Sequence, residues 1–278
     1  LASRDPATGE PCGVSVDLAR ELGVRLGVRV ELVVFDAAGK VVDALRTGAW
    51  DVAFLAIDPK RALDIAYTPP YVEIEGAFLV RDDSPVRANA DVDAPGVRVV
   101  VGEGSAYDLF LTRELKHATI VRAPTPAAVI EVFLAGAYDV AAGVRPKLEA
   151  DAKRHPGLRL VPGRFMVIRQ AMGVPRGRDA DARYLAGFIE AMKSSGFVAR
   201  ALARHGIEGE TGCDSGRLQA GKGIQGLMER GHRAAPLVEW EAACRPSERA
   251  RRRRYRQAAS GPVHSWSVRS RRCVAPAP

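Results

Sequence analysis

No stretch of the 278-residue sequence reaches the length of apolar chain, roughly 18 residues, that a membrane-spanning helix needs. A secretion leader is also missing, because no basic start is followed by an apolar stretch and a small-residue cleavage site. The chain begins at Leu1 and not at Met, so we expect a processed product or a fragment. For that reason the missing leader does not decide the compartment.

The sequence has only four cysteines, and they are far apart: Cys12 lies near the start, and Cys213, Cys244 and Cys273 lie near the end. No two of them have the close spacing of a zinc knuckle or a redox motif, so we expect unpaired thiols, no metal and no cofactor. No Ser–His–Asp or Cys–His arrangement can be argued either. The sequence therefore predicts no catalytic residue.

The net charge of +8 is confined to the end of the chain. Residues 210–278 hold 14 basic and 6 acidic residues, whereas residues 1–209 hold 27 of each sign. This tail is poor in large apolar residues and contains the arginine runs 251–254 and 269–272, so it predicts disorder. It could be a basic arm for nucleic acid or anionic lipid, an uninformative tail, or out-of-frame translation of a GC-rich gene. Because the first 209 residues are neutral, we predict no nucleic-acid partner.

Strand and helix signals alternate through residues 1–209, which indicates an α/β class with parallel sheets built by right-handed crossovers. Strands are predicted over 29–35, 51–56, 76–80, 97–101, 119–122, 139–142, 158–161 and 171–174, and helices over 41–47, 106–115, 125–134, 146–153, 180–193 and 196–205. Ligands bind such sheets at the carboxyl ends of strands. The expected binding places follow Ala56, Val101 and Ala142.

Residues 49–80 carry the most specific pattern, AWDVAFLAIDPKRALDIAYTPPYVEIEGAFLV. A strand that ends in small residues is followed by DPKR at 58–61, by YTPPY at 67–71 and by a further strand. The pattern resembles the signature region of the family 3 extracellular solute-binding proteins, the amino-acid-receptor type that serves ABC importers. Residues 13–19 resemble the beginning of that family's first helix, and residues 101–106 the start of its second lobe, so the resemblance spans 1–209 in order.

The resemblance implies an α/β, two-lobed, periplasmic-binding-protein-like fold of type II. Residues 1–80 plus 172–209 would form lobe one and 81–171 lobe two, closing by hinge motion on a ligand, and 210–278 would be the disordered tail. The family begins with a strand that precedes the first helix, and this sequence starts after it. We therefore expect a sheet that lacks its first strand and a chain that is weakly folded or incompetent to bind.

The function implied by the resemblance is that of a receptor, not an enzyme. It would capture a small carboxylate-bearing metabolite, an amino acid or an organic acid, for ABC import. We expect a monomer in the periplasm or outside the cell, with permease subunits and an anionic small molecule as its partners.

Arg61 is the first candidate for the site, because the family's arginine at this position grips the α-carboxylate of the ligand. A guanidinium suits that role, since it is always charged and presents a planar fork to two oxygens. Gly104, Ser105 and Ala106 open a helix after a strand. Their N–H groups and the serine hydroxyl can receive an anion, although Ser105 could equally be a helix cap without a ligand.

The remaining candidates mark departures from the family. Ala53 and Ala56 stand where amino-acid binders carry hydroxyl groups, with Ala56 expected beside the ligand. Arg145 follows the strand after which those binders place a carboxylate for the α-ammonium; it could add a second positive charge or point to solvent. Tyr71 could line the site or pack near the hinge. Together the departures favour an anionic ligand without an ammonium group.

Two other uses of the fold stay open. Some proteins that resemble these receptors are dehydratases of the cyclohexadienyl or prephenate type, which need an acid/base carboxylate in the cleft. Glu73, Glu75 and Glu103 are the acids available, and none matches a catalytic position. A ligand-sensing domain would share the same fold, because a fold does not fix its use.

Overall fold

The computed structural model describes residues 1–5, 7–207 and 265–271. All of these described residues belong to one compact unit. The second unit, 216–260, lies outside the described residues, as do Cys213, Cys244 and Cys273. Within the described ranges, no helix combines the length and the apolar character that a membrane span requires.

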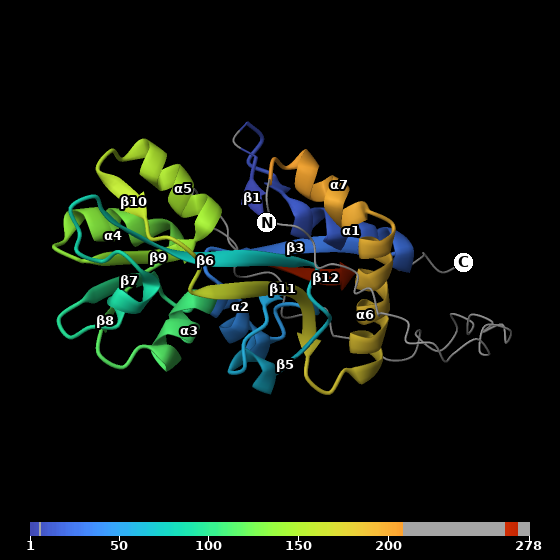
Figure 1. Ribbon diagram of the computed structural model, residues 1–278. Coiled ribbons are helices and arrows are strands. Elements are labelled where there is room, and N and C mark those ends of the chain that lie inside the picture. Colours follow the sequence, from blue (N-terminus) through green and yellow to red (C-terminus); the bar gives the residue numbers. More distant parts are fainter. Residues whose placement is uncertain (6, 208–264, 272–278) are drawn as a thin grey trace, which may run out of the picture. The chain divides into compact units, whose positions relative to one another are not determined.

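One mixed sheet organises the described residues (Figure 1). Its strand order is β3-β12-β4-β11-β6-β9-β7-β8, with β5 beside β11 and β10 beside β6. The strands are β3 (Arg29–Phe35), β4 (Val52–Ala56), β5 (Ile65–Tyr67), β6 (Val72–Arg81), β7 (Arg98–Gly102), β8 (Thr119–Ala123), β9 (Val140–Val144), β10 (Leu158–Leu160), β11 (Met166–Pro175) and β12 (Ser265–Arg271). A separate antiparallel pair joins β1 (Ser3–Arg4) to β2 (Pro11–Cys12).

The expectation of parallel sheets holds for only part of this sheet. Strand β7 pairs in parallel with β8 and with β9. The long strands β6 and β11 run antiparallel to each other, and β6 is also antiparallel to β9 and β10. Antiparallel pairing needs no helical crossover. The connections into β6 and β11 therefore contain no helix, and the alternation of strands and helices is broken there.

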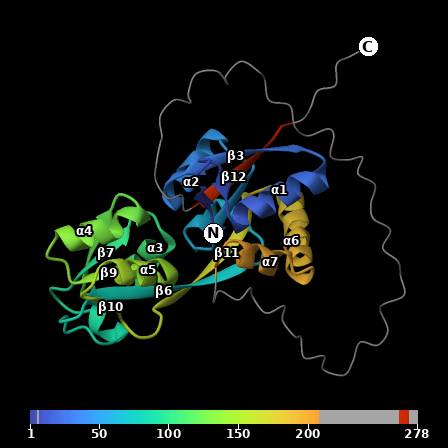
Figure 2. The ribbon, with the colours of Figure 1, turned by 90° about the horizontal axis from the view of Figure 1, so that it is seen from above.

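Two groups of helices cover the sheet (Figure 2). Helices α1, α6 and α7 contact one another in series and pack on β3 and β11, whereas α3, α4 and α5 pack against β6, β7 and β9. The helices are α1 (Val14–Leu26), α2 (Ala38–Ala44), α3 (Ala106–Glu114), α4 (Val129–Ala135), α5 (Arg145–Arg154), α6 (Asp179–Ser194) and α7 (Phe197–Arg204), with short 3-10 turns η1 (Leu45–Thr47), η2 (Arg61–Leu63), η3 (Asn89–Val92) and η4 (Pro126–Ala128).

The core explains the nearly continuous apolar run of β7. Val99, Val100 and Val101 are completely buried, and they belong to two different hydrophobic clusters. A strand that is covered on both faces has no solvent side, so its sequence shows no alternation. This places the carboxyl end of β7 inside the molecule, where the turn at residues 102–105 leads into α3.

Seven residues of the segment predicted as a tail form strand β12 in the structure. It lies between β3 and β4 and is antiparallel to both, from Ser265 opposite Phe35 to Arg271 opposite Arg29. The rest of the segment from residue 208 lies outside the described residues. The backbone N–H and C=O groups of β3 and β4 require partners, and composition alone does not reveal that demand.

Candidate functional site

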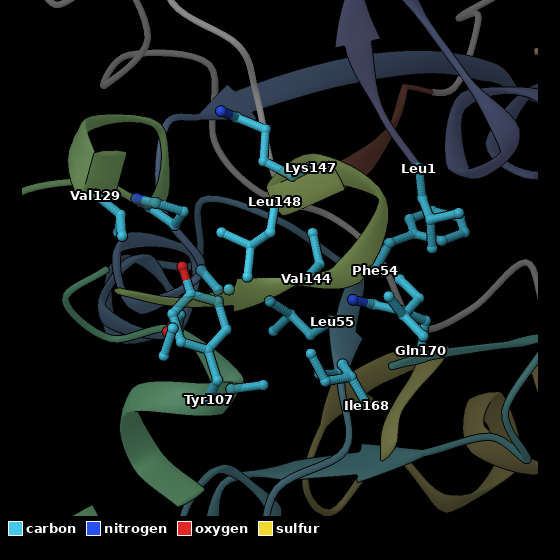
Figure 3. A pocket seen from close by; sticks show the side chains of 18 of the residues that line it. Leu1, Phe54, Leu55, Tyr107, Val129, Val144, Lys147, Leu148, Ile168 and Gln170 are labelled. Atoms are coloured by element: carbon cyan, nitrogen blue, oxygen red, sulfur yellow. The ribbon is translucent and has the colours of Figure 1, made fainter. Parts of the chain in front are cut away.

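A cavity of about 130 Å³ lies where the carboxyl ends of β4, β7 and β9 come together (Figure 3). Ala56 lines it from the end of β4, Ser105 and Ala106 line it from the segment after β7, and Ala142 lines it from β9. All three binding places expected from the strand ends therefore face one cavity. The long strands contribute Ile74 from β6 and Gln170 from β11, among others.

Arg61 brings a buried positive charge to this cavity. Its residue is only 3% exposed; Nη1 donates to the carbonyl of Ala56 at 3.1 Å and Nη2 donates to the carbonyl of Gly104 at 2.8 Å. Among the described residues, no carboxylate forms an ion pair with it, and the acid that precedes it, Asp58, pairs with Arg113 at 2.9 Å. Burial lowers the pKa of Arg61, against the opposing influence of Tyr67 and Asp58. The guanidinium is thus desolvated, and no carboxylate of the described residues is in ion-pair contact with it.

The start of α3 forms the neighbouring part of the wall. Ser105 caps the helix, because its Oγ accepts the N–H of Asp108 at 3.0 Å. The N–H of Gly104 donates to Oδ2 of Asp108 at 2.9 Å, so it is committed within the turn. The first N–H groups of a helix, here beginning with Ala106, have no partner within the helix and add a positive potential at this end. The expected role of Gly104 as an N–H donor is therefore not available, whereas Ala106 keeps its own.

Gly104 also makes a close backbone contact. Its φ is +67°, and a Cβ built on it would lie 3.1 Å from the Cα of Gly39 in α2. Its carbonyl is the one that accepts from Arg61. Gly104 does not itself line the cavity. It lies in the turn before α3 and contacts both α2 and the side chain of Arg61 at the cavity's edge.

The acids near the cavity are already neutralised. Asp151 lines the wall, is 1% exposed, and accepts from Lys147 Nζ at 2.6 Å on each oxygen and from Arg154. Asp108 is buried behind the turn and accepts from Arg122 Nε at 3.0 Å and from Thr112. Neither carboxylate is left to neutralise a cation that enters the cavity.

The rest of the wall is mostly apolar. Figure 3 shows its labelled side chains gathered around the cavity, with Tyr107 on α3, Lys147 on α5 and Gln170 on β11 as polar members. Burial raises the pKa of Tyr107 to about 12, against the lowering influence of Ser105 and the backbone of Gly102. Tyr107 is therefore neutral at ordinary pH. The apolar side chains are Leu1, Phe54, Leu55, Ile74, Val129, Val144, Leu148 and Ile168.

Two residues expected beside the ligand lie elsewhere. Arg145 donates to Oε2 of Glu75 at 2.7 Å and to the carbonyl of Gly163 at 2.5 Å, and it is not part of the cavity wall. Tyr71 is fully buried; its hydroxyl lies 2.9 Å from Oγ of Ser15, and its ring meets Phe54 edge-on. Arg145 is thus held by an ion pair rather than pointing freely to solvent, and Tyr71 packs in the core, as its alternative interpretation expected.

Several wall residues were missed by the sequence analysis. Lys147 lies on α5 and Gln170 on β11, both far from Arg61 along the chain. For Lys147 a signal existed, since it stands four residues before Asp151, the spacing of a helical ion pair. Gln170 lies in a strand whose polar residues gave no hint of a cavity.

The described residues offer little for acid–base or metal chemistry. Glu73 pairs with Arg169, Glu75 pairs with Arg145 and Arg164, and none of Glu73, Glu75 and Glu103 lines the cavity. The two neighbouring arginines lower the pKa of Glu75, which keeps it ionised. Within the described ranges no cluster of three or more His, Cys, Asp or Glu side chains is arranged for a metal ion.

Solved structures with a similar fold are binding proteins and a related sensor. A candidate binding component of an ABC transporter from Wolinella succinogenes, complexed with lysine, is 22% identical with a TM-score of 0.63 and covers 73% of this chain and 89% of that chain. An ancestral amino acid-binding protein, a precursor of cyclohexadienyl dehydratase, is 22% identical with a TM-score of 0.61 and covers 73% and 88%. A histidine kinase sensor domain is 23% identical with a TM-score of 0.62 and covers 75% and 90%.

The fold is accordingly the mixed α/β fold of periplasmic binding proteins, with the cavity at its strand ends. The family model for bacterial extracellular solute-binding proteins, family 3, matches residues 3–207, and the chain belongs to this family. The family expected from residues 49–80 is confirmed. A comparison with curated proteins found no match.

Proposed function

We propose that this chain is the extracytoplasmic receptor of an ABC importer and captures a small carboxylate-bearing metabolite, an amino acid or an organic acid, without altering it. The observation that carries the proposal is the buried guanidinium of Arg61, which reaches the cavity without a carboxylate partner among the described residues. A buried charge without a counter-ion is costly. An anionic ligand removes that cost, so the site is built to favour its bound state.

The carboxylate would lie between Arg61 and the start of α3. Arg61 uses one donor on the Ala56 carbonyl and one on the Gly104 carbonyl, and a guanidinium has five N–H donors in a fixed fork. The N–H of Ala106 and the positive end of the helix add to the same binding place, with Ser105 setting where the helix begins. Ala56 and Ser105 would then contribute mainly to the shape of the binding place. The side chain of Ala56 has no polar group, and the Oγ of Ser105 accepts the N–H of Asp108.

Closure around the ligand would follow from two lobes, residues 1–80 plus 172–209 and residues 81–171. Strands β6 and β11 would be the hinge, since they connect the strands β4 and β5 to the strands β9 and β10 in the sheet order. Away from the strands that the proposed lobes share, contacts between the lobes include Arg61 to the carbonyl of Gly104, Arg113 to Asp58, and Gly104 against Gly39. Each brings the residues after β4 or the start of α2 to α3, as expected for a closed form.

The importer setting implies a monomer in the periplasm or outside the cell that docks on permease subunits. Two alternatives use the same cavity. A ligand-sensing domain is favoured by the likeness to a histidine kinase sensor domain, and the site itself does not separate it from a receptor. A dehydratase is disfavoured, because Glu73, Glu75 and Glu103 do not line the cavity, and Asp151, the acid among the described wall residues, is paired with Lys147 and Arg154.

The test is thermal unfolding of the full chain against a panel of amino acids, monocarboxylates and dicarboxylates. A ligand that binds the native state raises the melting temperature by mass action. We expect a rise with at least one carboxylate, loss of that rise in Arg61→Ala, and its retention in Arg145→Ala, whose side chain is a matched guanidinium outside the cavity. A rise that survives Arg61→Ala but not Arg145→Ala would contradict the assigned site. Turnover of a prephenate-like substrate would instead favour the dehydratase.

A further inference from the structure

The cavity wall has an unusual charge balance for a site that would hold an amino acid. Its charged side chains are Arg61, Lys147 and Asp151. Asp151 spends both oxygens on Lys147, at 2.6 Å each, and also accepts from Arg154. Lys147 and Asp151 neutralise each other, so the charged side chains of the described wall residues leave one net positive charge, that of Arg61.

From this balance and the apolar lining, we infer that the ligand is a monocarboxylate with an apolar body about the size of a benzene ring and no ammonium group. The inference rests on the proposed function and narrows its ligand class. It departs from what the structural relatives hold, since one of them is complexed with lysine.

An ammonium group would have no counter-ion in this cavity. Asp151 is the one acid among the described wall residues, and its oxygens are taken. A second cation would join Arg61 in a desolvated place, and like charges brought together there cost several kcal/mol, on the order of a hundredfold in affinity or more. If the ammonium group of the ligand paired with Asp151 instead, Lys147 would be left without its carboxylate partner.

A second carboxylate is disfavoured by the same balance. Arg61 is the one cation of the described wall that has no carboxylate partner, because Lys147 is held by Asp151. Arg154, which also contacts Asp151, is largely exposed and points its charge into water. One negative charge therefore completes the site, and a dianion would leave one carboxylate buried without a cation.

The apolar side chains and the volume set the body of the ligand. Phe54, Leu55, Ile74, Val144, Leu148 and Ile168 face the cavity. Its volume of about 130 Å³ compares with an engineered protein cavity on the order of 150 Å³, lined by similar side chains, that binds benzene. An aromatic ring or a branched aliphatic chain of that size fits; a long basic side chain such as that of lysine does not find a partner there.

The experiment compares ligands that share one skeleton, using the full chain and isothermal calorimetry. The aromatic set is phenylacetate, phenylglycine, phenylmalonate and phenylacetamide, and the aliphatic pair is 4-methylpentanoate and leucine. We expect the monocarboxylates to bind, on the order of a hundredfold or more tighter than their ammonium-bearing counterparts. The dicarboxylate and the uncharged amide should bind weakly or not at all.

A variant of the wall tests the cause. Val144 lies at the end of β9 and faces the cavity, partly buried. Val144→Asp supplies the missing carboxylate and should shift the preference toward phenylglycine and leucine, whereas Val144→Asn, of the same shape without the charge, should not. The Asn variant also controls for a loss of folding, because both place a polar group at this position.

The outcomes separate this inference from the proposed function. Binding of phenylglycine or leucine in preference to the matched acids would overturn the ligand class and leave the receptor proposal standing. Preference for phenylmalonate would overturn the single-charge argument. If none of the six compounds and none of the wider panel binds, and Arg61→Ala behaves as the parent, the receptor proposal fails and this inference fails with it.

Discussion

Two short segments meet at the hydrogen bond between Arg61 and the Gly104 carbonyl, and they treat buried charge in opposite ways. In the segment after β4, Arg61 is buried and donates to two carbonyl oxygens, and no carboxylate of the described residues is in ion-pair contact with it. In the turn before α3, Asp108 is equally buried but accepts from Gly104, Thr112 and Arg122. A satisfied charge holds a structure together, whereas an unsatisfied one marks a place where a ligand is needed.

The largest effect on stability should come from removing the buried carboxylate of Asp108, which has hydrogen-bond and ion-pair partners. Asp108→Ala removes the acceptor for the Gly104 N–H and leaves Arg122 without its partner, and we expect a loss of about 2 to 3 kcal/mol in the free energy of unfolding. The measurement is urea unfolding at neutral pH. Asp139→Ala, which removes a half-exposed carboxylate paired with Arg98, is the matched control and should cost about 1 kcal/mol or less. Equal losses in the two variants would contradict the comparison.

The next largest effect on stability should come from the close approach of Gly104 to Gly39. Gly104→Ala places a side chain at φ +67° and 3.1 Å from the Cα of Gly39, and we expect a loss of about 1 to 2 kcal/mol with weaker ligand binding. Gly96→Ala is the control, because Gly96 also has a positive φ, +86°, but a Cβ there meets nothing within 4 Å. A loss of ligand affinity in Gly104→Ala alone would show that the close approach matters, beyond backbone strain. Unchanged affinity in both would argue against it.

A smaller contrast lies in two tyrosine hydroxyls. Burial raises the pKa of both Tyr67 and Tyr107 to about 12, so both are neutral at ordinary pH. Ser105 and the backbone of Gly102 interact with the hydroxyl of Tyr107 and lower its pKa against the effect of burial, whereas the hydroxyl of Tyr67 is buried without a hydrogen-bond partner among the described residues. Tyr107→Phe should cost about 1 kcal/mol, and Tyr67→Phe should be neutral or slightly stabilising. Calorimetric melting of the two variants side by side checks the opposite signs.

The smallest effect on stability is expected where the effect on binding is greatest. Arg61→Met removes a buried charge and keeps an apolar stem of similar reach, so unfolding in the absence of ligand should change by no more than about 1 kcal/mol. Ligand binding should nevertheless be lost. A variant that unfolds readily without ligand would mean that Arg61 is structural, and the contrast with Asp108 would disappear.

The sequence predicts those strands whose surroundings leave a local mark. The run at Arg29–Phe35 is β3 residue for residue, and the apolar run at 97–101 is β7 displaced by one position. Strand β11 was predicted only over 171–174 but extends over Met166–Pro175. Its first half contains Arg169 and Gln170, which interrupt the apolar pattern, and it is held as a strand by pairing with β6. Such pairing is not encoded within the segment itself.

The site divides in the same way. The position of Arg61 at the cavity could be predicted because it stands inside a distinctive motif, and that of Ser105 and Ala106 because a strand, a glycine turn and a helix follow one another. The position of Arg145 after a strand predicts a place beside the ligand. Its side chain instead pairs with Glu75, which is 70 residues away along the chain, and does not line the cavity. Distant partners decide where a long charged side chain points, and a sequence read locally does not contain them.

Strand β12 has a consequence for biosynthesis. The sheet positions on either side of it, β3 and β4, are made early, but the strand that joins them ends at Arg271. At synthesis rates of about 5 to 20 residues per second, roughly 10 to 40 seconds pass before the two edges can be bridged. During that time each edge exposes unpaired backbone groups that another nascent chain could pair with. Correct folding of this sheet therefore depends on keeping neighbouring chains apart until the last strand has been made.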